Sequence, residues 1–420
     1  MTSMKTIALI AEYNPLHNGH LQQIEYIKKH FSTKNEEVKI ILIMSGNFVQ
    51  RGEVSSLDKY TKAKLAVEHG ISLVIELPVV FATAAARDYA RANINLISKL
   101  NVVSEIVCGV ENPELKDTFK LISQELEPES KRFKEALEHN LNQGLNYASA
   151  REKSLISIFP EEAANIKTIL GKSNNILALE YLLAIRAENI ERERLNKRLL
   201  KLYFSPREND YSATKIRKVL LSEKTKTARI KALETSVPSK VLASLINKDF
   251  REYKNLYLSS INTVLSSSKE ELLQYRDLDE DLVNRLKNKS IEFLSQKDQN
   301  LSNYFAFLST KYYPITRIKR SILAKLLGIK SKDYELMKKD GPSFINLLAA
   351  DKDGKYLIKL LRKLSTLPNT VKNSDLREEL NNNLATSKIQ QKLNLKADML
   401  YKLLCEDFST SLYKDYLYIL

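Results

Sequence analysis

The sequence predicts an α/β fold: a Rossmann-like parallel sheet in the first half, followed by a mainly α-helical, basic second half. Apolar runs of strand length alternate with segments of helical period as far as residue 110. No glycine occurs between Gly171 and Gly328, where Leu, Lys, Glu and Ile predominate. The positive charge is concentrated after residue 200. We expect two domains, covering residues 1–222 and 223–420.

The expected elements of the first domain follow one another in a strand–helix order. Strands are expected at residues 7–11, 38–44, 73–77 and 106–108, and helices at residues 21–31, 59–69 and 82–100. This alternation is typical of a parallel sheet covered by helices. In open sheets of this kind ligands bind beyond the carboxyl ends of the strands. The turn around His17, the turn Ser45-Gly46-Asn47 and Gly109 should therefore meet at one edge.

One helix of the second half combines an apolar face with positive charge. The segment Ile315 to Leu327 places five aliphatic residues on one side and Arg317, Arg320 and Lys325 near or across from it. This pattern fits a helix that contacts a polyanion. An ordinary surface helix would show the same pattern.

Composition limits the class of protein. With 420 residues, 43% hydrophobic and 28% charged, the chain is an ordinary globular protein with room for two or three domains. No apolar run is long enough for a transmembrane helix, and Met1 to Lys5 lead into the first strand without the pattern of a signal peptide. Cys108 and Cys405 are too far apart for a metal-binding motif, so we expect reduced core thiols and a cytoplasmic location.

The net charge of +15 is unevenly distributed. Residues 1–200 carry 26 Lys and Arg against 25 Asp and Glu, a balance of +1. Residues 201–420 carry 40 against 26, a balance of +14. A basic half attracts polyanions and suggests a nucleic-acid partner. Lysine-rich solvated surfaces are the simpler alternative.

The most informative segment runs from Glu12 to His20, between the first strand and the first helix. Backbone N–H groups are unpaired at a helix start and the helix dipole favours negative charge, so this turn suits a nucleotide's phosphates. His17 and His20 are three positions apart and can face one phosphate, while Gly19 lets the backbone come close. Asn14-Pro15 favours an extended approach to the turn. A purely structural histidine pair remains the alternative.

Two signatures carry a family resemblance. His17 to His20 resembles the H-x-G-H motif of the nucleotidyltransferase superfamily, and Tyr211 to Arg217 resembles its second signature, in which Ser/Thr and Arg close over the phosphates. Longer strings resemble the bacterial tRNA(Met) cytidine acetate ligase family: Ala11–His20, Met44–Glu53 and Ser173–Leu177, and more weakly Tyr313–Arg320 and Lys396–Tyr401.

The resemblance implies an enzyme that forms acetyl-adenylate from ATP and acetate. It then transfers the acetyl group to N4 of the wobble cytidine of elongator tRNA(Met). The implied catalytic residues are His17, His20 and Arg217. The implied ATP site comprises Ile10, Ala11, Glu12, Tyr13, Asn14, Pro15, Leu16, His17, Asn18, Gly19, His20, Leu21, Gln22, Gln23, Gly109, Asn174, Asn175, Lys201, Ser212 and Thr214.

One position departs from the family pattern. An Arg normally precedes the second signature, and Lys201 is the best-aligned cation here. Because Lys lacks the planar fork of Arg, the contact could be weaker or could be made by Arg207 instead.

The resemblance also suggests roles for single residues. His17 and His20 would donate to the reacting phosphates, Arg217 with Lys215 or Lys218 would hold pyrophosphate, and Ser212 and Thr214 would supply hydroxyl donors. Arg51, Arg317, Lys319 and Arg320 are expected to contact tRNA, and Glu12 receives no role. Mg²⁺ would accompany ATP, although no acidic cluster for a metal is visible in the sequence.

Two other functions would use parts of the same sequence. A metabolite adenylyltransferase would need the histidine turn, but not a basic helical half. A catalytically inactive RNA-binding homologue would need the charge, but not the turn.

Overall fold

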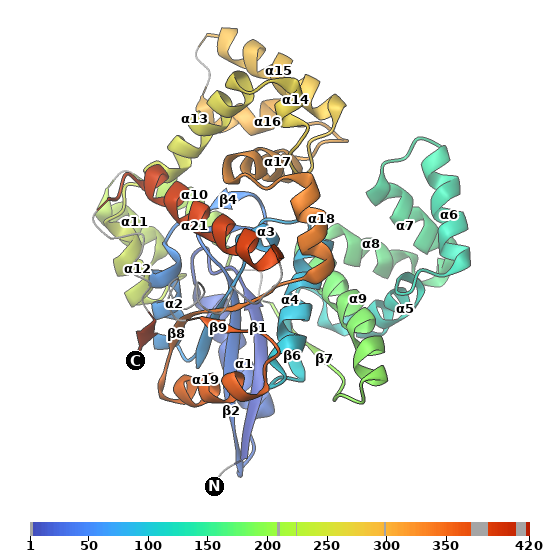
Figure 1. The fold of residues 1–420 in the computed structure, drawn as a ribbon, viewed down its shortest axis with the longest axis vertical. Helices are drawn as coiled ribbons and strands as arrows, with labels where there is room; N and C mark the ends of the chain where they lie inside the picture. The colour runs from blue at the N-terminus through green and yellow to red at the C-terminus, as the bar shows by residue number, and fades with distance from the viewer. Residues whose placement is uncertain (1–2, 208–210, 224, 298–299, 371–384, 409–416) are drawn as a thin grey trace.

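The computed structural model describes residues 3–207, 211–223, 225–297, 300–370, 385–408 and 417–420. A sheet in the order β10-β8-β5-β2-β1-β6-β7, with β9 beside β8, forms its centre (Figure 1). Its strands are β1 (Ser3–Ala11), β2 (Glu36–Ser45), β5 (Leu73–Leu77), β6 (Glu105–Val110), β7 (Lys201–Pro206), β8 (Ile345–Ala350), β9 (Asn369–Thr370) and β10 (Tyr418–Ile419). The five strands from β5 to β7 are parallel, and four of them, β5, β2, β1 and β6, coincide with predicted strands, whereas β8 is antiparallel to β5.

Helices cover both faces of this sheet and extend beyond it. They are α1 (Asn18–Phe31), α2 (Lys59–Glu68), α3 (Val79–Ala82), α4 (Ala86–Leu100), α5 (Lys116–Leu126), α6 (Lys131–Asn142), α7 (Tyr147–Ile158), α8 (Ala163–Gly171), α9 (Ser173–Arg194), α10 (Ala213–Ser222), α11 (Lys226–Leu233), α12 (Ser239–Ile246), α13 (Arg251–Ser266), α14 (Lys269–Leu272), α15 (Glu280–Ser295), α16 (Tyr304–Leu308), α17 (Ile315–Leu327), α18 (Ser331–Asp340), α19 (Lys352–Leu364) and α21 (Ala385–Cys405). Short 3₁₀ turns occupy Pro113–Leu115, Pro160–Glu162 and Leu301–Asn303, and β3 (Phe48–Val49) and β4 (Glu53–Val54) form a small hairpin.

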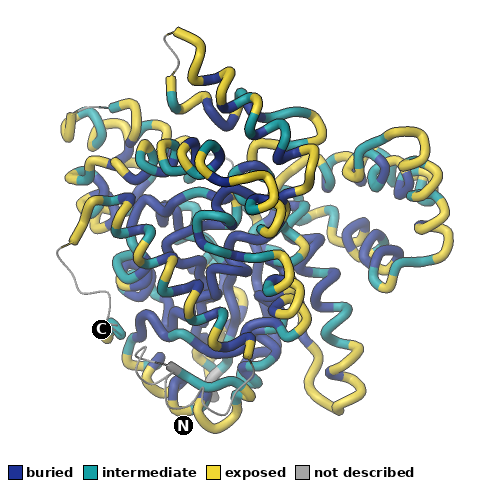
Figure 2. The backbone as a smooth tube through the Cα atoms, turned by 45° about the horizontal axis from the view of Figure 1, so that its top comes forward, coloured by how far each residue is buried: buried dark blue, intermediate teal, exposed yellow. Residues whose placement is uncertain are grey.

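The core follows from the alternation of side chains along β1. Ile7 and Leu9 join one apolar cluster with α1 and α2, whereas Ala8 and Ile10 join another with α4 and α9. Both faces of the strand are therefore buried, which is why it is a continuous apolar run. Figure 2 shows this buried centre, with exposed residues concentrated on the surrounding helices. A third cluster, formed by α13 to α17, lies above the sheet in Figure 1.

The order of the strands determines where a ligand can bind. From β1 the chain proceeds to β2 and β5 on one side, and then returns to β6 and β7 on the other. The connections therefore change direction between β1 and β6, and the crevice at such a switch point is the usual ligand site of an open α/β sheet. The histidine turn after β1 and Gly109 in β6 both lie at this point.

Several expectations for single elements need correction. The helix expected at residues 82–100 is divided into α3 and α4, with Thr83, Ala84 and Ala85 between them. No strand was expected after residue 110, yet β7, β8, β9 and β10 all join the sheet. The β8 sequence, INLLAA, is rich in helix-forming residues, and packing on both faces overrides that preference. The domain boundary at residue 222 remains a prediction. β8 belongs to the second half of the chain but pairs with the central sheet.

No helix in the described part of the chain is both long and apolar enough to cross a lipid bilayer.

Candidate active site

The two histidines of the turn lie against each other. His17 is the N-cap of α1 and His20 lies in its first turn, and their stacked rings have centroids 3.8 Å apart. The backbone N–H of His17 donates to Nδ1 of His20 at 3.2 Å. Because Nδ1 acts as an acceptor, the neutral His20 ring carries its proton on Nε2. His20 can therefore donate one hydrogen bond to a ligand in the site.

Both rings are neutral at physiological pH. Burial, reinforced by the positive charge of Arg207, lowers the pKa of His17 to about 3. Burial also lowers the pKa of His20 well below its usual value, with further contributions from His17 and Arg207. Both ring nitrogens of His17 are buried and have no hydrogen-bond partner among the described residues. Buried polar atoms of native proteins are normally paired, so these nitrogens are available for a ligand.

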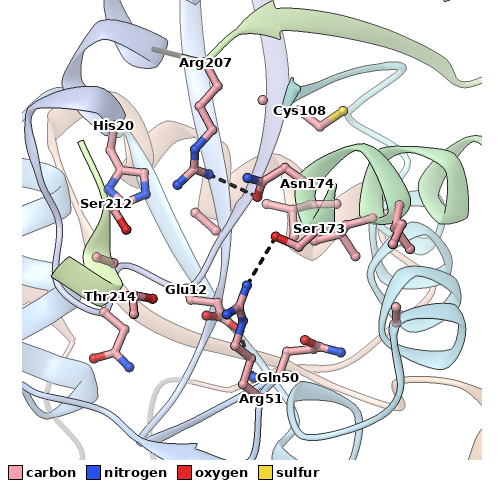
Figure 3. A pocket seen from close by; sticks show the side chains of 18 of the residues that line it. Glu12, His20, Gln50, Arg51, Cys108, Ser173, Asn174, Arg207, Ser212 and Thr214 are labelled. Carbon is pink, nitrogen blue, oxygen red and sulfur yellow. Dashed lines mark hydrogen bonds between the residues drawn. The ribbon is translucent and has the colours of Figure 1, made fainter. Parts of the chain in front are cut away.

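The end of β6 and the start of α9 form the opposite side of the site. The Glu111 carboxylate accepts hydrogen bonds from the backbone N–H groups of Asn174 and Asn175, at 3.4 and 3.0 Å, and so caps α9. The Oδ1 atom of Asn174 accepts a hydrogen bond from Arg207 at 3.1 Å, and both residues face the cavity (Figure 3). Asn175 is fully buried and bonds to the backbone N–H of Glu111, so its role is structural.

Gly109 in β6 lies close to the Gln23 side chain of α1. A Cβ there would lie 3.3 Å from Nε2 of Gln23, which itself donates to Oγ of Ser205 at 2.9 Å. This bond joins α1 to β7 across the switch point. A small shift of the Gln23 side chain would accommodate a Cβ at position 109, so the contact is close without requiring glycine.

The second signature lies at the start of α10. Ser212 is its N-cap and accepts a hydrogen bond from the Lys215 backbone N–H, and Thr214, Lys215 and Arg217 line the cavity. Arg217 donates to the backbone oxygen of Asn14 at 2.7 Å and to the Glu53 carboxylate at 3.0 Å. The signature is thus joined directly to the turn that carries the histidines.

The loop after β2 contacts α17 of the second half. Gly52 has φ +70°, and a Cβ there would lie 2.6 Å from the backbone nitrogen of Arg320. Lys319 pairs with the Glu53 carboxylate at 2.7 Å, and Arg320 lines the cavity. A side chain at position 52 would separate the loop from α17, so glycine permits this contact.

These elements enclose one cavity of about 1100 Å³. That is at the upper end of the range for small-molecule sites, and it leaves space for a second reactant beside a nucleotide. Figure 3 shows Arg207 and Asn174 on one side, Ser212 and Thr214 on another, and Arg51 bonded to Ser173 across the opening. Three aromatic residues that the sequence analysis did not identify also line it: Tyr89, Tyr147 and Tyr181.

Most of the residues expected in the site line this cavity. They are Ile10, Ala11, Glu12, Tyr13, Asn14, His17, Gly19, His20, Gln23, Arg51, Gly109, Asn174, Ser212, Thr214, Lys215, Arg217 and Arg320. The cavity lining does not include Pro15, Leu16, Asn18, Leu21, Gln22, Asn175, Lys201, Lys218, Arg317 or Lys319. Arg317 instead pairs with Asp279 at 2.6 Å. His17, His20 and Arg217, the three residues expected to be catalytic, all reach the cavity.

Lys201 lies at the wrong end of its strand to contact a ligand here. It opens β7, opposite Glu105 at the start of β6, and its side chain is exposed. Arg207 follows the other end of β7, about 20 Å away at strand spacing, and lines the cavity. The alternative cation considered for this position is therefore the one that faces the site.

Three comparisons relate this chain to known proteins. A sequence model described as HIGH Nucleotidyl Transferase matches residues 4–415. A tRNA(Met) cytidine acetate ligase of Caldanaerobacter subterraneus is 35% identical over 87% of this chain and 88% of its own length. The enzyme of the same name from Fusobacterium nucleatum is 34% identical over 85% of each chain.

Two solved structures share the fold. Thermotoga maritima TmcAL bound with alpha-thio ATP superposes with a TM-score of 0.83 at 23% identity, covering 96% of this chain and 95% of that chain. The apo form of the same protein gives 0.85 at 22% identity, covering 99% of this chain and 100% of that chain. At this level of identity the likeness establishes the fold.

Proposed function

This chain belongs to the HIGH nucleotidyl transferase family and, within it, to the tRNA(Met) cytidine acetate ligases, and from that premise we propose how its site works. It is an ATP-dependent ligase that acetylates a cytidine of tRNA. Acetate attacks the α-phosphorus of ATP, which releases pyrophosphate and leaves acetyl-adenylate. N4 of the wobble cytidine of elongator tRNA(Met) then takes the acetyl group, and AMP departs.

The observation that carries this proposal is the convergence of the histidine turn and the second signature. His17, His20 and Arg217 come from two distant segments and line one cavity at the switch point. Charge develops on the phosphoryl oxygens and on pyrophosphate during adenylation, so donors fixed in advance lower the barrier. The neutral histidines would donate to the α-phosphate region, and Arg217 with Lys215 would hold pyrophosphate.

Arg217 would have to exchange partners when ATP binds. In this structure its guanidinium is held by Asn14 and Glu53. A triphosphate carries more charge than Glu53 and offers paired oxygen acceptors to the planar fork of Arg. We propose that this exchange brings α10 toward the nucleotide.

Mg²⁺ would enter with ATP. The described residues contain no group of three His, Cys, Asp or Glu side chains that could hold a metal ion. Mg²⁺ in nucleotide sites is held largely by phosphates and water, with one or two carboxylates. No step proposed for this enzyme is assigned to the ion.

Three incubations test the function. With ATP, acetate and tRNA together, mass spectrometry should find N4-acetylcytidine at the wobble position, and omission of either ATP or acetate should abolish it. ATP consumption that is independent of tRNA and acetate would indicate a metabolite adenylyltransferase. tRNA binding without ATP consumption would indicate an inactive RNA-binding homologue. Acting on tRNA, the ligase would work in the cytoplasm.

Arg207 should contribute to ATP binding, and Lys201 should not. Loss of a charge-assisted hydrogen bond to the nucleotide should raise the KM for ATP of Arg207→Ala about 10- to 100-fold. Lys201→Ala provides the matched control, since it removes a cation from the other end of β7. Initial-rate measurements of pyrophosphate release would check both. A larger effect at Lys201 would contradict this assignment.

Binding of tRNA should weaken steeply as salt is raised. Each phosphate contact contributes about 0.7 to 0.9 to the slope of log K against log salt. We expect Arg317→Ala combined with Arg320→Ala to weaken binding and to reduce that slope. Lys131→Ala on α6, whose side chain is 92% exposed, is a control for the loss of surface charge. Equal affinity at low and moderate salt, or an unaffected double variant, would refute a tRNA surface at α17.

A further inference from the structure

One carboxylate of the cavity is held by one of its two oxygens. Glu12 is the first residue after β1 and lines the cavity, and Figure 3 shows its side chain between Thr214 and Arg51. Its Oε1 accepts a hydrogen bond from the backbone N–H of Gln50 at 2.8 Å. Among the described residues, Oε2 makes no hydrogen bond or ion pair. The carboxylate is therefore fixed in direction and still able to accept a proton or a hydrogen bond.

The other two carboxylates of the cavity are fully occupied. Glu53 bonds to Arg217 through one oxygen and to Lys319 through the other, and these cations lower its pKa despite its burial. Glu111 uses both oxygens to cap α9. Neither has a free oxygen to offer to a substrate.

The remaining titratable groups of the site are poor proton acceptors. His17, with a pKa of about 3, and His20 are weak bases, and their position suits phosphate binding. The ammonium group of Lys62 lies outside the cavity lining and donates to three backbone carbonyls. Burial raises the pKa of both Tyr89 and Tyr181, so these phenols stay protonated.

We propose that Glu12 binds the exocyclic amine of the cytosine and accepts its proton during acetyl transfer. This inference rests on the proposed function. A carboxylate suits the N4 amino group, which only donates hydrogen bonds, and repels the O4 acceptor of uracil. Glu12 would thus select cytosine as well as activate it.

Groups in the cavity account for every bond and proton of the transfer step. N4 of cytosine forms a bond to the acetyl carbon, and the bond from that carbon to the phosphate oxygen breaks with its electron pair going to AMP. The amine nitrogen becomes acidic as it acquires positive charge, and its proton moves to Oε2 of Glu12. Solvent removes the proton after AMP and the acetylated tRNA leave.

The surroundings of Glu12 give it a useful basicity. Burial raises its pKa above the usual 4.5, and this effect exceeds the opposing influence of the Gln50 hydrogen bond and of the nearby charges of Arg217, Arg51 and Lys62. A base is most effective when its pKa approaches the working pH. The transfer rate should therefore rise with pH up to the raised pKa of Glu12 and then level off.

Two separate assays of Glu12→Gln test the proposal. Single-turnover transfer from chemically prepared acetyl-adenylate to tRNA should fall about 10²- to 10⁴-fold, the usual contribution of a general base. The acetate-dependent exchange of pyrophosphate into ATP, which reports adenylation alone, should fall far less. The rise of the transfer rate with pH should also disappear. A glutamine at this position keeps an acceptor for the Gln50 N–H, which limits disturbance of the fold.

Controls separate this role from structural effects. Glu12→Asp should recover part of the transfer rate and its pH dependence. Glu180→Gln removes a buried carboxylate that pairs with Arg151 outside the cavity lining and should change neither assay. Transfer by Glu12→Gln at the wild-type rate, or equal losses in the two assays, would overturn the proposal. A wild-type protein unable to form acetyl-adenylate would instead overturn the proposed function.

Discussion

Replacing His20 with Ala should lower the rate of pyrophosphate release about a hundredfold or more, while tRNA affinity stays nearly unchanged. The neutral His20 ring carries its proton on Nε2 and lines the cavity, and removal of one preorganised donor typically costs on the order of 3 kcal/mol in the transition state. The tRNA surface proposed here is formed by other residues, so binding should survive. Pre-steady-state pyrophosphate release and a tRNA binding titration measure the two quantities.

His20 also has a structural role at the start of α1. Its Nδ1 accepts the N–H of His17, so alanine also removes a helix cap, with a typical cost of about 1 kcal/mol in stability. His20→Asn keeps an acceptor and an amide donor, and should show an intermediate rate with normal stability. His30→Ala removes an exposed histidine from the same helix and should be silent. If His20→Ala lost adenylation and tRNA binding together, the histidine would be structural.

The sequence was sufficient to predict the parts of the fold that have a strong local pattern. The runs that became β1, β2, β5 and β6 are buried on both faces and therefore mostly apolar, with Lys39 and Glu76 as exceptions, and α17 has the predicted limits of Ile315 and Leu327. β8 was not predicted, because its Leu and Ala residues taken by themselves favour a helix. Its strand conformation depends on pairing with β5, which lies some 270 residues earlier in the chain.

The site was predictable where one short segment contributes several groups. Most residues of the histidine turn and of the second signature line the cavity, and their spacing in the sequence indicates a phosphate site, while their catalytic roles stay predictions. Tyr89, Tyr147 and Tyr181 come from separate helices and carry no motif, so only the packing of those helices reveals them. Lys201 and Arg207 could not be distinguished by alignment, because the sequence does not show that the whole of β7 separates them.

Lys62→Met should destabilise the fold and disorganise the site together. Lys62 is 2% exposed, and its ammonium group donates to the backbone oxygens of Glu12, Ser45 and Gly46 at 3.1, 2.9 and 2.8 Å. It therefore joins the carboxyl ends of β1 and β2 beneath the cavity. Methionine fills the same volume but leaves these buried carbonyls unpaired, which should reduce the free energy of unfolding by about 3 to 5 kcal/mol.

The pH dependence of stability measures the cost of burying the charge of Lys62. Burial lowers its pKa in the folded state from 10.5 to about 8. Between these values the unfolded chain binds more protons, so Lys62 makes the free energy of unfolding rise with pH across that window. The difference between the wild type and Lys62→Met should show this slope in denaturant titrations at several pH values.

Lys64→Met provides a control on the same helix. The Lys64 side chain is 51% exposed, so this substitution should change the free energy of unfolding by less than about 0.5 kcal/mol. A slope in Lys62→Met equal to that of the wild type would mean that other groups titrate in this window and that burial does not lower the pKa of Lys62.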